Sequence, residues 1–307
     1  MKDETMEPSG VLIINKPSGM TSHDVVGRIR RLYGLRRVGH TGTLDPMATG
    51  VLVLLIGRAA KAAEYLMCDR KAYTATLRLG LVTDSGDITG KILSQTDFLP
   101  EESMVQAVLE SFRGEIEQIP PMYSALKVGG QKLVNLARRG ITIEREPRKI
   151  TIYSLKAFPT DEKRDYRLEV DCSGGTYIRT LCEDIGAALG CGGTMASLCR
   201  TATGSYGLNR AHTIDQLELM TAEERLAQLL PVESLFADLP ALHLSPFYEK
   251  LIRGGCAVLQ KKLGCHFPVG TRIQLLTETG SFFALGEAIE SEEDSVPAVK
   301  AVKTFVL

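Results

Sequence analysis

The sequence predicts an α+β protein: a mostly antiparallel sheet flanked by helices, followed by a small β-rich unit. Strand-like and helix-like segments alternate without the regular βαβ rhythm of a parallel sheet. The 307 residues exceed what a single hydrophobic core usually holds, so a body plus a smaller module is expected. Around Pro240 the pattern changes to short β-type runs, which is typical of a small barrel.

The first part of the chain begins with an apolar strand at Val11–Asn15. Thr21 or Ser22 can cap the helix that follows, because the apolar residues after them recur at helical spacing. Four more elements and a connector are expected here: a strand at Val51–Leu55, a helix at Arg58–Met67, a strand at Ala72–Leu79, a helix at Met104–Phe112 and a connector over Gly114–Ser124.

The second part continues with a helix over Lys132–Arg139, which stops at Gly140, a candidate C-terminal cap. The next expected elements are strands at Ile150–Lys156, Tyr166–Cys172 and Ser205–Arg210, a helix at Tyr177–Leu189, and a mostly helical connector at Ile214–Leu230. The β-type runs of the last part are Ala257–Gln260, Arg272–Thr277, Ser281–Glu290 and Ala298–Phe305.

The charge is unevenly distributed, although the formal net charge is only −1. Residues 11–80 contain 11 Lys and Arg against 4 Asp and Glu, and residues 125–160 contain 8 against 2. Such polarisation fits a cationic face that binds a polyanion. Chance clustering on a solvated surface explains the same counts, and charge alone leaves both interpretations open.

The seven cysteines, at positions 68, 172, 182, 191, 199, 256 and 265, form no CxxC pair, and their number is odd. This pattern disfavours a disulfide framework and a zinc site, and it suits free thiols in a reducing compartment. The N-terminal segment has no apolar signal-peptide core, and no stretch approaches membrane-spanning length. We therefore expect a cytoplasmic protein without membrane contact.

The stretch GHTGTLDPMATG, residues 39–50, is the most informative in the chain. It places Asp45 between a glycine-rich turn and Pro46, directly before the apolar run Val51–Ile56. Proline restricts the backbone of the residue before it, so the aspartate is pre-set in a rigid loop. Two interpretations remain at this point: an ordinary Asp-Pro turn, or a carboxylate presented in a partly dry, positively charged cleft.

Six segments resemble the TruB family of tRNA pseudouridine synthases, in that family's order and over roughly two-thirds of the chain. They are VLIINKPSGMTSHDVV, GHTGTLDPMATGVL, GRAAKAAEYL, KAYTATLRLG, PPMYSALKVGG and GGTYIRTL. The resemblance implies a pseudouridine-synthase-type catalytic domain over residues 1–238, with an RNA-gripping insertion at about 125–150. It also implies a PUA-like RNA-binding domain over residues 239–307.

The resemblance implies three catalytic residues. Asp45 corresponds to the essential aspartate, and Arg179 to the arginine that pairs with it. A buried carboxylate stays ionised only beside a cation, and a guanidinium can bind one bidentately. Tyr73 matches the active-site tyrosine, whose ring can stack on a base and whose phenol can relay a proton. Taken alone, a tyrosine on a strand is more often part of a core.

Further residues are implied for substrate binding. His40 matches the histidine that fills the space left by a flipped base, and Tyr177 and Leu198 match positions lining the uracil pocket. Lys16 and Lys61 are candidate phosphate or loop contacts, although both suit an ordinary exposed lysine equally well. Arg138 and Arg139 lie in the insertion, where Val134 departs from the tyrosine common in the family.

The implied function is isomerisation of uridine to pseudouridine at position 55, in the T loop of tRNA. The target base must be flipped out before reaction, and no cofactor or metal is required. A guide-RNA-dependent enzyme is the first alternative, and a catalytically idle RNA chaperone is the second. The short N-terminal segment before the first motif favours a stand-alone enzyme. We therefore expect a monomer that needs no protein partner.

Two other enzyme classes are disfavoured by the residues themselves. Glycoside hydrolysis requires a second clearly placed acid, which the motifs do not supply. A Rossmann enzyme requires a G-x-G-x-x-G fingerprint directly after a strand, and the sequence has none.

Overall fold

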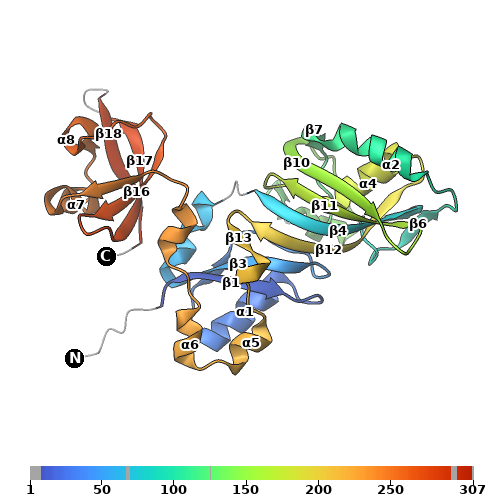
Figure 1. The fold of residues 1–307 in the computed structure, drawn as a ribbon, viewed down its shortest axis with the longest axis horizontal. Helices are drawn as coiled ribbons and strands as arrows, with labels where there is room; N and C mark the ends of the chain where they lie inside the picture. Colours follow the sequence, from blue (N-terminus) through green and yellow to red (C-terminus); the bar gives the residue numbers. More distant parts are fainter. Residues whose placement is uncertain (1–7, 67–69, 125, 292–295, 306–307) are drawn as a thin grey trace.

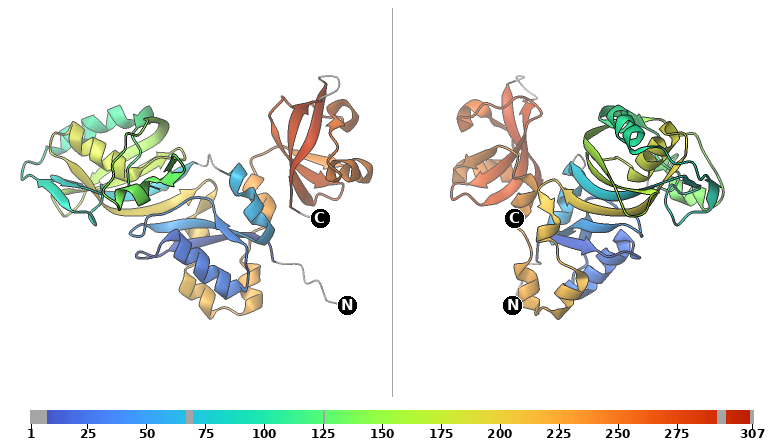
Figure 2. Two further views of the ribbon diagram at one scale, coloured as in Figure 1. Left: turned by 180° about the vertical axis from the view of Figure 1, so that it is seen from behind. Right: turned by 45° about the vertical axis from the view of Figure 1, so that its right-hand side comes forward.

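The computed structural model describes residues 8–66, 70–124, 126–291 and 296–305. A nine-stranded sheet forms the larger part, and a five-stranded sheet with two short helices forms the C-terminal part (Figure 1). Figure 2 shows the C-terminal sheet to one side of the larger sheet, joined to it through the segments around residues 60 and 235. Among these described residues, no helix is long and apolar enough to cross a membrane.

The large sheet is mostly antiparallel, as predicted. Its main strands run in the order β1 (Gly10–Lys16), β3 (Thr49–Ile56), β12 (Gly193–Thr203), β4 (Lys71–Leu79), β11 (Asp165–Cys172), β10 (Arg148–Pro159) and β7 (Gly114–Gln118). Two short strands, β2 (Val38–His40) and β13 (Tyr206–Gly207), pair with β3 and β12. The exception is a parallel seam between β12 and β3, where Cys199 pairs with Thr49 and Arg200 with Gly50.

Helices cover the large sheet and short elements connect its strands. The α-helices are α1 (Ser22–Tyr33), α2 (Glu102–Leu109), α3 (Leu133–Ala137), α4 (Ile178–Ala188), α5 (Ile214–Leu219) and α6 (Ala222–Ala227). The 3-10 helices are η1 (Gly57–Tyr65), η2 (Glu110–Phe112), η3 (Leu208–Arg210) and η4 (Val232–Phe236), and the short hairpin strands are β5 (Leu81–Thr83), β6 (Ile92–Gln95), β8 (Lys127–Val128) and β9 (Gln131–Lys132). Thr21 caps α1 in a capping box with Asp24, which confirms one of the two predicted caps.

The strands β1 and β3 are buried on both faces. Leu12 and Leu52 point into the main core, which also includes apolar residues of α1 and α4. Their neighbours Ile13 and Val53 point the other way, into a second core shared with η1, η4 and the C-terminal sheet. Burial on both faces explains why these strands are continuous apolar runs rather than alternating ones.

The C-terminal sheet runs in the order β14 (Ala241–Leu244), β16 (Arg272–Thr277), β17 (Phe282–Glu290), β18 (Pro297–Thr304) and β15 (Val258–Leu259). Helices α7 (Pro246–Arg253) and α8 (Gln260–Leu263) pack beside it (Figure 1). Phe236 of η4 contacts Phe282 and Phe305 at centroid distances of 5.7 and 5.6 Å, which fixes this sheet to the larger one. In the part of the chain that the structure describes, β14 and β15 do not pair to close the sheet. The predicted small barrel is therefore not confirmed.

Several local predictions were wrong. The longest omission is β12, whose polar residues and two register shifts interrupt the alternation that marks a strand. β7 occupies part of the predicted connector Gly114–Ser124. The predicted strand at Ser205–Arg210 is a strand only at Tyr206–Gly207, the strand β13, and its last three residues form the 3-10 helix η3. The predicted helix Arg58–Met67 is the 3-10 helix η1; its last residue, Met67, and the neighbouring Cys68 lie outside the described residues.

Candidate active site

The segment between β2 and β3, residues 41–48, contains Asp45 and is called the aspartate loop below. Its backbone is bound by side chains from distant elements. The Leu44 N–H donates to the Ser22 hydroxyl at 2.9 Å, and that hydroxyl lies 3.1 Å from the Leu44 carbonyl oxygen. The Met47 carbonyl accepts from the Ser18 hydroxyl at 3.2 Å. The loop is thus a fixed turn, as the Asp-Pro pattern predicted.

Lys16 binds the same loop from beneath. Its side chain is fully buried, and its ammonium donates to the carbonyl oxygens of Met20 at 2.6 Å, Pro17 at 2.9 Å and Pro46 at 3.2 Å. Burial lowers the pKa of this ammonium to about 8, against the attraction of Asp45. This candidate phosphate or loop contact therefore binds backbone oxygens inside the protein, and the alternative of an ordinary exposed lysine is wrong. It fixes the residue next to Asp45.

The Asp45 carboxylate faces Arg179 of α4. The Arg179 Nε lies 3.0 Å from Asp45 Oδ2, and the arginine side chain is only 6% exposed against 34% for the aspartate. The other two guanidinium nitrogens donate to backbone carbonyls, Nη1 to Ser85 at 3.1 Å and Nη2 to Tyr123 at 2.7 Å. The predicted pairing is confirmed in position, but the donors are divided among three partners and do not form a fork on the carboxylate.

Burial raises the pKa of Asp45 above its ordinary value, and the Arg179 guanidinium opposes that shift. Asp87 adds to the rise, while Lys16 acts with Arg179 to lower the pKa. Asp87 lies on the turn after β5; its carboxylate accepts from the Ser85 hydroxyl at 3.0 Å and the Thr89 N–H at 2.9 Å. Three charged neighbours thus control the ionisation of one accessible carboxylate.

Tyr73 lies on β4 and is 8% exposed, and Asp45 is near enough to act on the pKa of its phenol. Burial raises the pKa of its phenol, and the strongest opposing influence is Arg200. Arg200 is itself 2% exposed and pairs directly with Tyr73 in the register of β12 and β4. A fixed phenol beside a fixed carboxylate can stack on a flat ring and exchange a proton with it.

Two family models match the sequence. The N-terminal domain of TruB family pseudouridylate synthase matches residues 30–178, and the C-terminal domain of tRNA pseudouridylate synthase B matches residues 179–237.

The chain belongs to the TruB family.

Curated members of the TruB family are similar over most of their length. The tRNA pseudouridine synthase B of Syntrophotalea carbinolica is 45% identical over 92% of this chain and 93% of that protein. The enzyme of the same name from Francisella philomiragia is 47% identical over 80% of this chain and 81% of that protein. A chain in the crystal structure of a Cbf5–Nop10–Gar1 complex is 28% identical, with a TM-score of 0.73, and covers 97% of this chain and 85% of that one.

Two pocket residues implied by the TruB resemblance lie on elements that meet at the site. Tyr177 immediately precedes α4, and its backbone N–H and carbonyl are bound by the Gln118 amide at 2.7 and 3.0 Å. Leu198 is 9% exposed on β12 and pairs with Ala75 of β4. Tyr177 therefore lies two residues before Arg179, at the start of α4. Leu198 lies two residues before Arg200, on β12.

His40 ends β2, directly before the aspartate loop. Its ring meets that of His23 edge-on, with centroids 5.9 Å apart. Burial lowers the pKa of His40, and the neighbouring His23 and Arg200 lower it further. The lowered pKa favours the neutral imidazole, which can contact a base or a ribose without adding a positive charge.

The remaining predicted residues lie on other elements. Lys61 belongs to η1, and its ammonium lies 3.3 Å from the Thr304 carbonyl oxygen at the junction with the C-terminal sheet. Arg138 and Arg139 directly follow α3 in the insertion, and both are exposed. Asp45 and Arg179 are thus in direct contact, Tyr73 is coupled to Asp45 through charge, the two insertion arginines are exposed, and Lys61 contacts the C-terminal strand β18.

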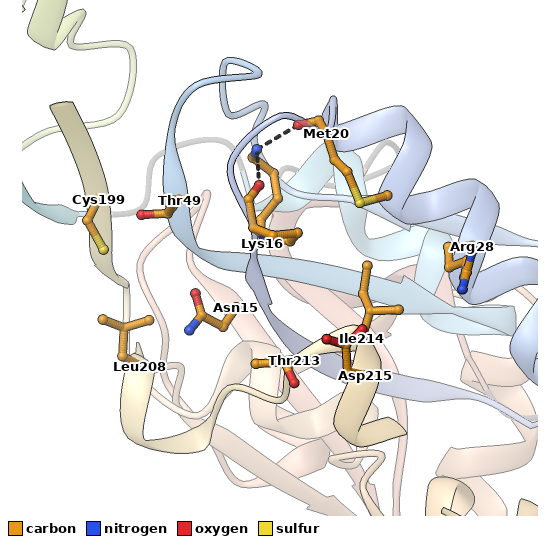
Figure 3. A pocket seen from close by; sticks show the side chains of 11 residues that line it. Asn15, Lys16, Met20, Arg28, Thr49, Cys199, Leu208, Thr213, Ile214 and Asp215 are labelled. Carbon is orange, nitrogen blue, oxygen red and sulfur yellow. Dashed lines mark hydrogen bonds between the residues drawn. The ribbon is translucent and has the colours of Figure 1, made fainter. Parts of the chain in front are cut away.

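A cavity of about 570 Å³ opens at the edge of β1 (Figure 3). Figure 3 shows the Lys16 ammonium bonded to backbone oxygens at one end of this cavity, with Asn15 and Thr213 along its wall. Asp45, Tyr73 and Arg179 are not among the residues that line it. The cavity therefore includes Lys16, which binds the aspartate loop, but not the three candidate catalytic residues.

Sequence reasoning missed two residues of the site, Asp87 and Arg200. Asp87 is 6% exposed and Arg200 2% exposed, so both are buried charges that need partners. Arg200 lies two residues after Leu198, which the resemblance placed in the pocket, and this position was the one sign in the sequence that Arg200 belongs to the site.

Proposed function

We propose that this TruB-family protein converts uridine to pseudouridine at position 55, in the T loop of tRNA. The observation that supports this most strongly is the Asp45 carboxylate, accessible on one side and held on the other by the buried Arg179 at 3.0 Å. The curated relatives bear the name tRNA pseudouridine synthase B, which agrees with a tRNA substrate. The monomeric, stand-alone state remains part of this proposal.

The reaction breaks the bond from C1′ to N1 of uridine and forms a bond from C1′ to C5. The C5 proton leaves, and N1 gains a proton, so the product is an isomer of the substrate. Asp45 can add to C1′, add to the base or remove the C2′ proton; each route requires an ionised and fixed carboxylate. Tyr73 is the candidate to stack on the detached base and to relay the C5 proton, its phenol oxygen accepting that proton as its own O–H proton passes on to another acceptor. These steps use groups of the protein and the substrate and call for no cofactor.

The target uridine must leave its stacked position to reach Asp45. We propose that His40 occupies the space it leaves, and that Tyr177 and Leu198 line the pocket that receives the base. The neutral imidazole and the partly buried Tyr177 ring suit contact with uncharged base surfaces. The exposed Arg138 and Arg139 contact phosphates of the stem, where charge acts at long range.

We also propose the domain division 1–238 and 239–307, with the C-terminal sheet as a PUA-like RNA-binding unit. Its helix α8 presents Lys261 and Lys262 to solvent. Replacing both with glutamate is expected to weaken binding of a full tRNA and leave binding of an isolated T stem-loop unchanged. Equal weakening of both ligands, or of neither, would contradict a separate contact outside the T arm.

The central experiment incubates an unmodified tRNA transcript with the pure protein and maps pseudouridine by carbodiimide-dependent primer-extension stops. Asp45→Asn is the test variant, and Asp161→Asn, at an exposed turn, is the matched control. A single T-loop stop with the wild type and the control, but absent with Asp45→Asn, is expected. A stop elsewhere would change the substrate position. Tight binding without any stop would favour a chaperone or a guide-dependent enzyme, the class to which the Cbf5 complexes point.

A further inference from the structure

Arg200 is the buried cation that the proposed mechanism leaves without a role. Its side chain reaches from β12 to the base of the aspartate loop, where it makes three contacts with backbone oxygens. The Nη2 donates to the Gly42 carbonyl at 3.0 Å, the Nη1 approaches the Thr43 carbonyl at 3.4 Å, and the Nε donates to the Val51 carbonyl at 2.7 Å. Each nitrogen of the guanidinium is thus directed at a backbone oxygen just before or just after the turn that presents Asp45.

The arginine backbone is fixed as firmly as its side chain. Arg200 pairs with Gly50 in the parallel seam, where Gly50 has a φ of +99°. A Cβ added at Gly50 would lie 2.2 Å from the Arg200 carbonyl oxygen, so only glycine allows this approach. Because both ends of the side chain are fixed, movement of β12 is transmitted to the loop.

The same residue faces the second catalytic candidate. Arg200 pairs with Tyr73 across β12 and β4, on the strand side opposite to its partner in β3. One residue therefore lies between the strand that supplies the tyrosine and the loop that supplies the aspartate. Tyr73 is on β4, and Asp45 is in the loop that leads into β3. Because β12 lies between these two strands, the distance between Tyr73 and Asp45 depends on how β12 holds them.

A purely structural explanation for this arginine is weak. Removing a guanidinium from water is costly, and backbone carbonyls compensate that cost less well than a carboxylate would. An apolar side chain would fill the same volume at lower cost, as buried ion groups replaced by apolar residues show in other proteins. A buried cation that binds backbone oxygens on one side and interacts with the Tyr73 phenol on the other fixes geometry that apolar packing would leave variable.

We propose that Arg200 is a positioning residue for the reaction of this site, setting the aspartate loop relative to Tyr73. Lys16 binds the loop at Pro46, beyond the aspartate, and Arg200 binds it at Gly42 and Thr43, before it. The two cations thus restrain the turn on both sides of Asp45. This inference rests on the proposed function, because it assigns Arg200 to that reaction.

The test compares Arg200→Lys with the wild type. Lysine keeps the charge and loses the fork, so it cannot bind Val51 and the two loop carbonyls together. Arg78→Lys is the matched control: it removes the fork that Arg78 makes to Asp165 at 2.7 Å, at the opposite end of β4 from Tyr73. Should Arg200→Lys fail to fold, Arg200→Gln serves for the same comparison, because it retains a donor without the charge.

Two quantities are measured on the full chain. Hydrogen exchange of peptides covering residues 41–48 is expected to accelerate about tenfold or more in Arg200→Lys, with other regions unchanged. Under single turnover on a tRNA transcript, the rate constant is expected to fall about 100-fold, while the dissociation constant for tRNA changes less than about twofold. The control should leave both quantities at wild-type values.

Unchanged loop exchange in Arg200→Lys would overturn the proposal, whatever the rate. Accelerated exchange together with a wild-type single-turnover rate constant would overturn it too. Arg200 would then fix the loop, but the reaction would not depend on that restraint. If the wild type itself formed no pseudouridine, the proposed function would fail. The exchange measurement would still decide separately whether Arg200 fixes the loop.

Discussion

The aspartate loop and the insertion, residues 126–147, differ in how firmly the rest of the protein holds them. The loop is restrained by Lys16, Ser22 and Arg200 from three different elements. The insertion contains only the short β8–β9 hairpin and the five-residue α3, and most of its side chains are exposed. Reaction chemistry requires fixed atoms, whereas binding a folded RNA can proceed through exposed charges that adapt to it. The difference suggests that mutations in the two regions will separate rate from affinity.

One buried side chain connects the two regions. Arg179 binds Asp45 through Nε and the Tyr123 carbonyl through Nη2, and Tyr123 lies just before the insertion. At the other end of the insertion, the Arg145 Nη1 donates to the Pro120 carbonyl at 3.1 Å. The insertion is therefore mostly exposed, with the buried Leu133 of α3 and these contacts at its base as its attachments. Variants can test which residues affect the rate constant of the reaction and which affect the affinity for tRNA.

The largest effect is expected for Asp45→Asn. Loss of the carboxylate should lower the single-turnover rate constant by about 10⁴-fold or more, because the amide can neither add to the sugar nor take a proton. The affinity for tRNA should remain within about twofold, since phosphate contacts dominate binding. Filter binding and primer extension measure the two quantities. Collapse of tRNA binding would mean that Asp45 is structural and that the two regions are not separable.

Arg179→Lys is expected to produce the next largest effect. The ammonium keeps the charge but cannot serve Asp45, Ser85 and Tyr123 together, so the rate constant should fall about 100-fold or more. Because the Tyr123 contact is lost as well, tRNA affinity should also weaken, unlike in Asp45→Asn. Wild-type rates would remove the pairing argument, and an unchanged affinity would show that the base of the insertion does not depend on Arg179.

Reversing the charge of Arg138 and Arg139 should act only on binding. The double glutamate variant is expected to bind tRNA about tenfold more weakly and to flatten the salt dependence of the binding constant, because fewer counterions are released. The rate constant at saturating protein should stay at the wild-type value. Titrations at several salt concentrations measure the slope, and an unchanged slope would exclude this part of the insertion from the RNA-binding surface.

The smallest effect concerns pH. The Lys16 pKa of about 8 means that the ammonium loses a proton as the pH rises through that value, and one of its three carbonyl contacts is lost with it. The rate constant should fall by about half near pH 8. The stability should change in the opposite direction: the folded pKa lies below the unfolded value of 10.5, so the unfolded chain binds more protons above pH 8 and stability rises with pH.

Rate and unfolding measurements between pH 7 and 10 test this opposition. Lys16→Met removes the titrating group, so its lower rate should show no alkaline decline with this midpoint. On the acid side, the rate should fall as Asp45 is protonated, at a pH above the ordinary value of 3.8, because burial raises its pKa. A parallel loss of rate and stability above pH 8 would mean that unfolding, not Lys16, causes the decline.

The sequence was sufficient for the parts of the site that local patterns encode. The Asp-Pro turn and the Thr21 cap were predicted from such patterns, whereas the partnership of Asp45 with Arg179 was implied by the family resemblance. The burial of Lys16 was not predicted, because a lysine is rarely fully buried without a carboxylate partner. Arg200 was missed because β12 contains two register shifts, so its inward and outward residues do not alternate. The contacts that fix the loop join residues far apart in the sequence, so no local pattern predicts them.

The length of chain between partners in the site has a consequence for biosynthesis. The Arg200 bond to Val51 spans 149 residues and its bond to Gly42 spans 158. During translation Asp45 leaves the ribosome long before β12, the strand that restrains its loop. For that time the nascent chain contains the complete motif of residues 39–50 but cannot assemble the site. Closing such distant contacts is slow compared with forming helices. A truncated or stalled chain that ends before β12 is therefore expected to be inert towards RNA modification, however complete its N-terminal motifs.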